Sequence, residues 1–254
     1  MVRSRVPCRI LGVIPARFAS SRFPGKALAR LQSSTLLEHV YSRACAARSL
    51  TEVVIATDDQ RIFDEARRFG AKVRMTSTEH ASGTDRVAEV AAGDEADLVV
   101  NIQGDEPLLD PAAIDAAVEA IATGGAAPMA TLKKRIEDQR EVHDPNVVKV
   151  VTTFSGDALY FSRSPVPLLR DGGTCAWYKH IGLYVYRRDF LLRYSSLPVG
   201  PLERAEKLEQ LRALENGFAI RVAETTYDSI GVDTPEDLAR AAARMETVKD
   251  GVRA

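Results

Sequence analysis

The chain has 254 residues, of which 45% are hydrophobic and 27% charged, a composition typical of a globular protein with one sizeable core or two small ones. Its formal net charge of −1 disfavours a nucleic-acid or anionic-membrane binder, which normally carries a surplus of Lys and Arg, so we expect small-molecule partners. The three widely spaced cysteines lack a C-x-x-C pattern, and no apolar run or signal region is present, which favours a reducing cytoplasm.

The first half of the chain alternates strand and helix patterns with short connections. Strands are predicted over 10–14, 53–57, 72–76 and 98–102, and helices over 36–47, 62–69, 84–92 and from Pro111 to just before Gly124. Thr35 and Glu38 have the spacing of a capping box, and Asp110 and Pro111 suit the N-cap and first position of a helix. This alternation is typical of an α/β protein with a mainly parallel sheet covered on both faces.

The pattern changes near residue 145. Two β-rich runs, 147–153 and 159–162, flank Ser155-Gly156-Asp157 and predict an antiparallel hairpin rather than another βαβ unit. We therefore expect a single domain over 1–254 with an embedded subdomain at 145–200. The remaining predicted elements are a strand over 180–186, a helix over 202–215, a strand over 219–223 and a helix from Pro235.

The loop after the first strand carries three cations, Arg17, Arg22 and Lys26. Small residues between them keep the backbone N–H groups accessible, as a polyphosphate site requires, namely Ala19, Ser20, Ser21 and Gly25. A solvated surface loop is the alternative, but ligands of α/β sheets bind at the carboxyl ends of the strands. The Walker pattern is excluded because Ser20 and Ala27 stand where it requires Gly and Ser or Thr. We interpret the loop as a nucleoside triphosphate clamp.

Two carboxylates are candidates for the same crevice. Asp105 follows the apolar strand over 98–102, and Asp233 precedes a helix that Thr234 and Asp237 already cap. A Mg²⁺ held by Asp105 and Asp233 would relieve their repulsion with a triphosphate. The alternative roles are stabilisation of a turn for Asp105 and interaction with the helix dipole for Asp233.

A polar turn, His80-Ala-Ser-Gly-Thr-Asp-Arg86, begins the helix over 84–92. Its backbone N–H groups and the hydroxyls of Ser82 and Thr84 suit a nucleobase or a phosphate, although capping alone also explains Ser82. Further polar residues near the hairpin are each ordinary surface residues when taken singly: Asn146, Lys149, Arg163, Lys179 and His180.

From about residue 10 to residue 240, the chain resembles the 3-deoxy-manno-octulosonate cytidylyltransferases, also called CMP-Kdo synthetases. The resemblance rests on seven segments in family order: IPARFASSRFPGKAL, HASGTDR, NIQGDEP, PNVVKVV, YFSRSPVP, KHIGLYVYRRDFL and GVDTPEDL. It implies a three-layer, Rossmann-like nucleotide-diphospho-sugar transferase fold, with a mixed, mostly parallel sheet and a small antiparallel β subdomain for sugar binding and dimerisation. It also implies a cytoplasmic homodimer that activates Kdo, an acidic eight-carbon sugar, with CTP for lipopolysaccharide assembly. We expect no nucleic-acid or membrane partner.

The resemblance also implies roles for individual residues. Those implied for CTP binding are Pro15, Ala16, Arg17, Arg22, Lys26, Ser82, Gly83 and Thr84. Lys26, Asp105 and Asp233 would be catalytic, and Asp105 and Asp233 would bind Mg²⁺. Those implied for the sugar acid are Gln103, Arg163, His180, Tyr184 and an acid on the 202–215 helix, Glu206 or Glu209.

The reaction implied by the resemblance is in-line attack by the anomeric 2-hydroxyl of Kdo on the α-phosphorus of CTP, with release of pyrophosphate. Leu168 replaces a frequent aromatic residue and Lys179 a frequent Arg, so a modified acid such as 8-amino-Kdo is an alternative substrate. Sialate cytidylyltransferases, whose phosphate loop typically reads ARGGSK, fit less well. A non-catalytic nucleotide-binding module is the remaining alternative, and the presence of both Asp105 and Asp233 argues against it.

Overall fold

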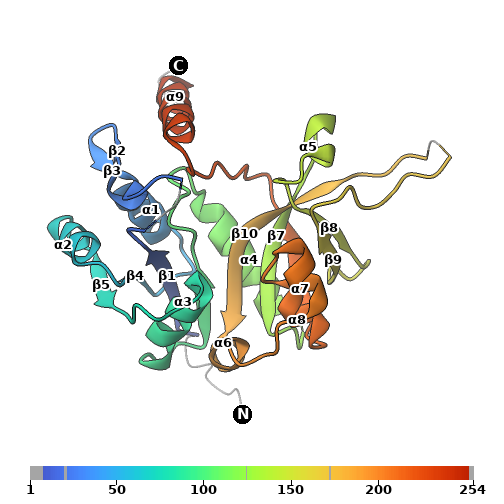
Figure 1. Ribbon diagram of the computed structural model, residues 1–254, viewed down its shortest axis with the longest axis horizontal. Coiled ribbons are helices and arrows are strands. Elements are labelled where there is room, and N and C mark those ends of the chain that lie inside the picture. The colour runs from blue at the N-terminus through green and yellow to red at the C-terminus, as the bar shows by residue number, and fades with distance from the viewer. Residues whose placement is uncertain (1–7, 20–21, 124, 172, 252–254) are drawn as a thin grey trace, which may run out of the picture. The chain divides into compact units, whose positions relative to one another are not determined.

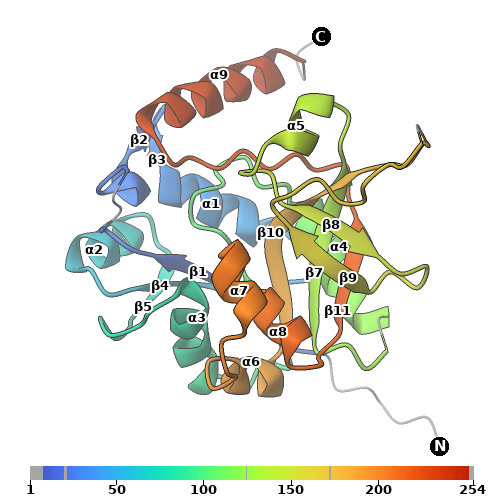
Figure 2. The same ribbon diagram turned by 45° about the vertical axis from the view of Figure 1, so that its right-hand side comes forward.

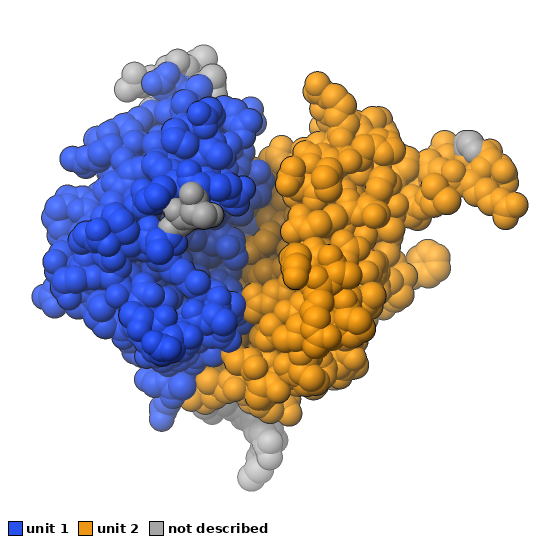
Figure 3. All heavy atoms as spheres, in the orientation of Figure 1, with its two compact units in different colours: residues 1–115, 229–254 blue, residues 116–228 orange. Residues whose placement is uncertain are grey.

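The chain forms two compact units in a computed structural model that describes residues 8–19, 22–123, 125–171 and 173–251 (Figure 3). Unit 1 comprises residues 1–115 and 229–254, and unit 2 comprises residues 116–228. Within the described ranges, no helix is both long and apolar enough to cross a membrane.

Unit 1 is built on parallel strands in the order β6, β1, β4, β5, of which β1, β4 and β5 are labelled in Figure 1. Their bounds are β1 Ile10–Ala16, β4 Glu52–Thr57, β5 Lys72–Met75 and β6 Leu98–Asn101. Val13 lies opposite Val54 on one side and Asn101 on the other, so β1 is a central strand. Because parallel strands end at the same edge, the loops after β1 and β6 meet there, and these loops carry Arg17 and Asp105.

Helices α1 (Leu36–Cys45), α2 (Gln60–Arg68) and α3 (Gly83–Ala92) pack on these strands. The apolar side chains that face the sheet, such as Val40 and Val87, are fully buried. Unit 1 also contains short pieces at Lys26–Leu28, β2 (Arg30–Leu31) and β3 (Ser34–Thr35) and the long helix α9 (Pro235–Gly251).

The predicted starts of α1 and α4 are confirmed. The Thr35 hydroxyl accepts a hydrogen bond from Glu38 N at the start of α1, although the Glu38 carboxylate binds Arg68 instead of completing a capping box. Asp110 Oδ1 accepts from Ala112 N where α4 (Pro111–Thr123) begins. Gly124, the predicted stop for α4, lies outside the described residues.

Unit 2 is centred on β7 (Met129–Arg135), which pairs antiparallel with β10 (Tyr178–Arg187) and parallel with β11 (Ile220–Glu224). The predicted hairpin is confirmed: β8 (Lys149–Thr152) and β9 (Ala158–Ser162) are antiparallel, and β8 also pairs with β10 (Figure 2). Short helices α5 (Gln139–His143) and α6 (Arg188–Tyr194) belong to the same unit.

Strand β7 was not predicted from the sequence, and the single helix predicted over 202–215 is wrong. The structure has two helices there, α7 (Pro201–Glu206) and α8 (Leu211–Glu215), separated by Lys207 with φ of 54°. Residues 207–209 all have helix-compatible types, so local preference gave no sign of the break. Tertiary contacts accompany it, since the Tyr194 hydroxyl donates to the Glu209 carbonyl at 2.6 Å.

The predicted fold class is confirmed as a mixed α/β structure with a mostly parallel sheet and a small antiparallel part. The boundary of unit 2 is wider than the 145–200 segment that the sequence pattern marked.

Candidate functional site

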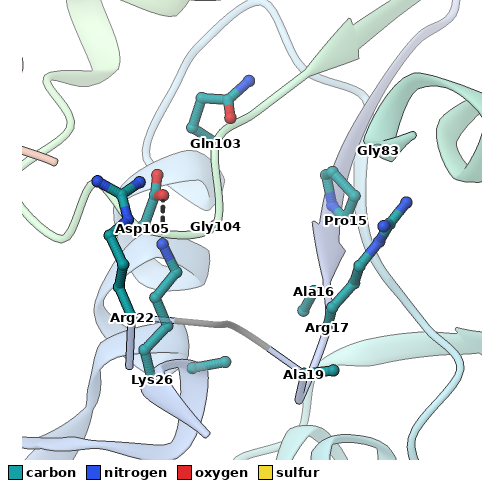
Figure 4. Close-up of a pocket in the computed structure, with 11 residues that line it drawn as sticks. Pro15, Ala16, Arg17, Ala19, Arg22, Lys26, Gly83, Gln103, Gly104 and Asp105 are labelled. Atoms are coloured by element: carbon teal, nitrogen blue, oxygen red, sulfur yellow. Dashed lines mark hydrogen bonds and ion pairs between the residues drawn. The ribbon is translucent and has the colours of Figure 1, made fainter. Parts of the chain in front are cut away.

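A cleft of about 350 Å³ opens in unit 1 at the carboxyl ends of β1 and β6 (Figure 4). Its lining residues come from the end of β1, the loop between β1 and β2, the start of α3 and the loop after β6: Pro15, Ala16, Arg17, Ala19, Arg22, Lys26, Ala27, Gly83, Gln103, Gly104 and Asp105. Six of the residues implied for CTP binding therefore line one cleft, together with Asp105 and Gln103. Small side chains dominate the remainder of the lining, which leaves backbone accessible to a ligand.

The strongest electrostatic feature of the cleft is the Lys26 ammonium. Its Nζ lies 2.7 Å from Asp105 Oδ2, 2.9 Å from Asp233 Oδ1 and 3.1 Å from the Val232 carbonyl oxygen. Burial lowers the pKa of Lys26, but the two carboxylates outweigh this effect and the pKa is raised overall. Lys26 is therefore a fixed cation that joins both carboxylates.

Asp233 is available to the cleft because other residues cap α9. The Thr234 hydroxyl accepts from Asp237 N, and Asp237 Oδ2 accepts from Thr234 N, which completes the predicted capping box. Arg22 Nη2 donates to Asp233 Oδ2 at 2.7 Å, so Asp233 binds cations through both of its carboxylate oxygens. Both predicted carboxylates are thus brought together with two of the three predicted cations.

Arg17 lies on the other side of the same cleft (Figure 4). Its Nη2 donates to the His80 carbonyl oxygen at 3.3 Å, which links the loop after β1 to the polar turn before α3. Two hydroxyls in that turn have other partners, since Ser82 Oγ accepts from Asp85 N and Thr84 Oγ1 accepts from Asn101 Nδ2. Within the described residues, Gly83 is the member of the Ser82–Thr84 turn that lines the cleft.

Gly104 is a lining residue that the sequence analysis did not single out. A Cβ placed there would lie 3.0 Å from the Pro15 carbonyl oxygen, so glycine permits the loop after β6 to approach the end of β1. Val232 N donates to the Asp105 carbonyl oxygen at 2.9 Å and attaches a third chain segment to the same loop. The glycine within Gln103-Gly-Asp105 was the available signal for this close approach.

A buried arginine supports the turn before α3 from within the fold. Arg86 is fully buried, its Nη2 donates to Asp58 Oδ2 at 2.6 Å, and its Nη1 donates to the Thr76 hydroxyl. A buried guanidinium needs such partners because an unpaired charge in the interior is costly. The charge pattern of 80–86 gave no sign that Arg86 points into the core.

Arg163 and Glu206, two residues implied for the sugar acid, are joined in unit 2. Glu206 accepts hydrogen bonds from Arg163 N at 2.9 Å and from the Ser162 hydroxyl at 2.7 Å, and Arg163 Nε donates to the Glu206 carbonyl oxygen. Lys149 is fully buried rather than a surface residue, and its ammonium donates to three carbonyl oxygens, including that of Arg163 at 2.6 Å. Those contacts fix the backbone that carries Arg163.

His180 and Tyr184 form a second group in unit 2. Their ring centroids are 5.3 Å apart, and His180 also meets Phe161 edge to face at 5.1 Å. The His180 Nε2 lies 3.0 Å from the Thr131 hydroxyl on β7. Burial lowers the pKa of His180 to about 3 and raises that of Tyr184, so both side chains stay neutral near pH 7.

The remaining residues implied for the sugar acid lie on different units. Gln103 lines the cleft of unit 1, whereas Glu209 belongs to the α7–α8 connection of unit 2. Lys179, which replaces a frequent Arg, has its ammonium 2.8 Å from both Glu141 and Asp228. Leu168 is exposed.

The donor set in the cleft suits Mg²⁺. Asp105 and Asp233 each place one carboxylate oxygen within 2.9 Å of the same Lys26 Nζ, so hard oxygen ligands converge on a position that already holds a cation. Protein sites that bind Mg²⁺ with phosphates commonly supply one or two carboxylates. Clusters of three or more His, Cys, Asp or Glu side chains able to hold a metal are absent from the described residues.

The sequence is similar to those of known cytidylyltransferases. The sequence matches the cytidylyltransferase family over residues 11–225. It is 64% identical to a 3-deoxy-manno-octulosonate cytidylyltransferase of Solibacter usitatus, over 92% of this chain and 94% of that protein. It is 53% identical to the enzyme of the same name from Geobacter metallireducens, over 93% and 98%.

A solved structure of a protein with a related name is also similar to this chain. The fold is similar to that of CMP:2-keto-3-deoxy-manno-octonic acid synthetase complexed with CTP, with a TM-score of 0.90 and 43% identity. The match covers 94% of this chain and 99% of the other. The similarity extends over both units, and it confirms the nucleotidyltransferase fold that the sequence segments implied.

The lowered pKa of His180 generates a pH prediction. Its pKa of about 3 in the folded protein lies below the value of about 6.5 for an unfolded histidine, so the unfolded state binds a proton first as the pH falls. The stability that neutral His180 contributes is therefore lost as the pH falls below about 6.5. In NMR spectra of the folded protein, the His180 ring signals should not shift between about pH 8 and pH 5. A midpoint near 6.5 would contradict the lowered pKa of this ring.

Proposed function

This chain belongs to the cytidylyltransferase family, and on that premise we propose that it transfers CMP from CTP to the anomeric 2-hydroxyl of Kdo, with release of pyrophosphate. The observation that carries the proposal is the cleft of unit 1, where Arg17, Arg22 and Lys26 occur beside Asp105. The 43% identical structure described as complexed with CTP supports the choice of nucleotide, and the names of the relatives support the choice of sugar.

The cations of the cleft suit the triphosphate. CTP carries several negative charges, and bringing it beside Asp105 without compensation would be repulsive. Arg17, Arg22 and Lys26 supply positive charge along the loop, while Gly83 and Gly104 leave backbone close to the ligand. Pro15 and Ala16 extend the lining toward the turn before α3, where we place the cytosine.

The proposed reaction makes and breaks one bond at the α-phosphorus. The 2-hydroxyl oxygen of Kdo loses its proton and bonds to the α-phosphorus, while the bond from that phosphorus to the bridging oxygen breaks and pyrophosphate leaves. Such a transfer depends mainly on positioning and on stabilising negative charge. Lys26 and Arg22 are held by ion pairs at 2.7 to 2.9 Å, so the cations are ordered before substrate binds.

We propose that Asp105 and Asp233 hold Mg²⁺ in this reaction. The metal would offset the charge of the phosphates and polarise the reacting groups. The shared approach of both carboxylates to Lys26 Nζ supports this assignment. Gln103, Arg163, His180, Tyr184, Glu206 and Glu209 are our candidates for binding the sugar acid.

We also propose that the chain acts as a homodimer in the bacterial cytoplasm and supplies CMP-Kdo for lipopolysaccharide assembly. The proposal rests on the resemblance of the seven sequence segments to CMP-Kdo synthetases. The segment over 145–200 would supply the dimer contacts. Sedimentation velocity tests the assembly, and a monomer at micromolar concentration would contradict it.

Pyrophosphate release across a panel of substrates tests the activity. CTP with Kdo should give the highest kcat/KM, and replacing CTP by UTP or ATP should lower it by about 100-fold or more, because a site built for one base leaves polar groups unpaired with another. The same assay should include 8-amino-Kdo and sialic acid. A higher kcat/KM with 8-amino-Kdo would change the sugar assignment. Binding of CTP without turnover on any sugar acid would favour the nucleotide-binding module.

Removal of either carboxylate tests the catalytic assignment. Asp105→Asn and Asp233→Asn should each lower kcat by about 100-fold or more at saturating Mg²⁺, because each loses a negative charge that we assign to the metal. Glu95→Gln is a matched control, since Glu95 is exposed in unit 1 and does not line the cleft. Near-normal turnover in either aspartate variant, with the melting temperature unchanged, would contradict the assignment.

A further inference from the structure

The aromatic ring of Phe18 connects the loop after β1 to helix α2. Phe18 directly follows Arg17, and its half-buried ring lies under the guanidinium of Arg61, whose Cζ is 3.2 Å from the ring centroid. This is the geometry of a cation–π contact, and the planar guanidinium also stacks well on an aromatic face. Phe18 belongs to the loop after β1 that carries Arg17, Arg22 and Lys26, which we call the phosphate loop. Its ring therefore packs against Arg61 of α2, a residue that does not line the cleft.

Asp59 fixes the guanidinium of Arg61 in place. Arg61 Nε donates to Asp59 Oδ1 at 2.9 Å and Nη2 donates to Asp59 Oδ2 at 2.6 Å, a two-pronged ion pair. Asp59 is itself the N-cap of α2 and accepts from Arg61 N, and its own N–H donates to the Thr57 hydroxyl at the end of β4. Hydrogen bonding to Arg61 lowers the pKa of Asp59, so the pair stays ionised at neutral pH.

The same ring meets the far end of the loop. Gly25 N donates to the Phe18 carbonyl oxygen at 2.9 Å, which closes the loop at its base. Gly25 has φ of 72°, and a Cβ placed on it would lie 3.1 Å from two ring atoms of Phe18. Arg17 directly precedes Phe18 and Lys26 directly follows Gly25, so two cations of the cleft flank this hydrogen bond in the sequence.

We propose that Asp59 and Arg61 are positioning residues for nucleotide binding, and that they act by stacking Arg61 on Phe18 at the base of the phosphate loop. This inference rests on the proposed use of CTP. Neither Asp59 nor Arg61 lines the cleft, so they act through Phe18 and not by contact with the nucleotide. The stack orders the base of the loop, at Phe18 and Gly25, before CTP arrives, which reduces the ordering that binding must supply.

The test compares variants in apo hydrogen exchange and in steady-state kinetics. In Arg61→Leu, the Gly25 amide should exchange several-fold faster, and the KM for CTP should rise roughly five- to tenfold, as expected for loss of a stacking contact. The KM for Kdo and the melting temperature should change little. Arg61→Lys should behave like Arg61→Leu, because Lys keeps the charge but not the planar two-pronged geometry.

Three further single variants separate stacking from charge and from general stability. Phe18→Tyr keeps the ring and should leave both the Gly25 exchange rate and the KM for CTP unchanged. Phe18→Leu removes the ring and should raise the KM for CTP. Adding Arg61→Leu to Phe18→Leu should raise that KM little further, because both changes break the same contact. Arg67→Leu removes the same charge from an exposed position on α2 and should leave the Gly25 amide and the KM for CTP unchanged.

The outcomes distinguish this inference from the proposed function. Unchanged Gly25 exchange and an unchanged KM for CTP in Arg61→Leu would overturn the positioning role, as would wild-type kinetics in Arg61→Lys. If the unmodified protein released no pyrophosphate from CTP and Kdo, while Arg61→Leu still accelerated Gly25 exchange, the loop contact would stand and the proposed function would fall.

Discussion

The arrangement of the cleft depends on the Lys26 ammonium, which forms ion pairs with both Asp105 and Asp233. Asp105 and Asp233 would repel each other at this separation if no cation lay between them. Lys26 Nζ lies within 2.9 Å of one oxygen of each and also binds the Val232 carbonyl oxygen. Because the carboxylates outweigh the effect of burial, the pKa of Lys26 is raised and the ammonium stays charged. The same cation therefore joins three segments of unit 1 that are distant in the sequence.

The order of the parallel strands brings those segments together. β1 and β6 are neighbours, so the loop that carries Lys26 and the loop that carries Asp105 emerge side by side at one edge. Gly104 permits their close approach, and the hydrogen bond from Val232 N to the Asp105 carbonyl adds the segment before α9. The cations and carboxylates are thus ordered in the absence of ligand, which suits a transfer that depends on positioning and electrostatics. Phe18 and Arg61 extend that order to the base of the phosphate loop.

The sequence was sufficient to predict the parallel strands and the main helices of unit 1, because the signals for these elements are local. Apolar runs marked the strands, capping residues such as Thr35 marked the helix starts, and Asp233 stood out because Thr234 and Asp237 already capped α9. Features that depend on tertiary contacts were not predictable in this way. The helix break at Lys207 occurs among good helix formers, and the burial of Lys149 depends on carbonyl groups supplied by the fold. The stack of Arg61 on Phe18 could not be predicted either, because the two residues are far apart in the sequence and no repeating pattern links them.

A crystal structure of this chain with bound CTP would show whether the cleft around Lys26 receives the triphosphate. We expect phosphate oxygens within hydrogen-bond distance of Lys26 and Arg22, with the cytosine beside Pro15 and Gly83. CTP bound elsewhere on the protein, with no phosphate oxygen near Lys26, would contradict it.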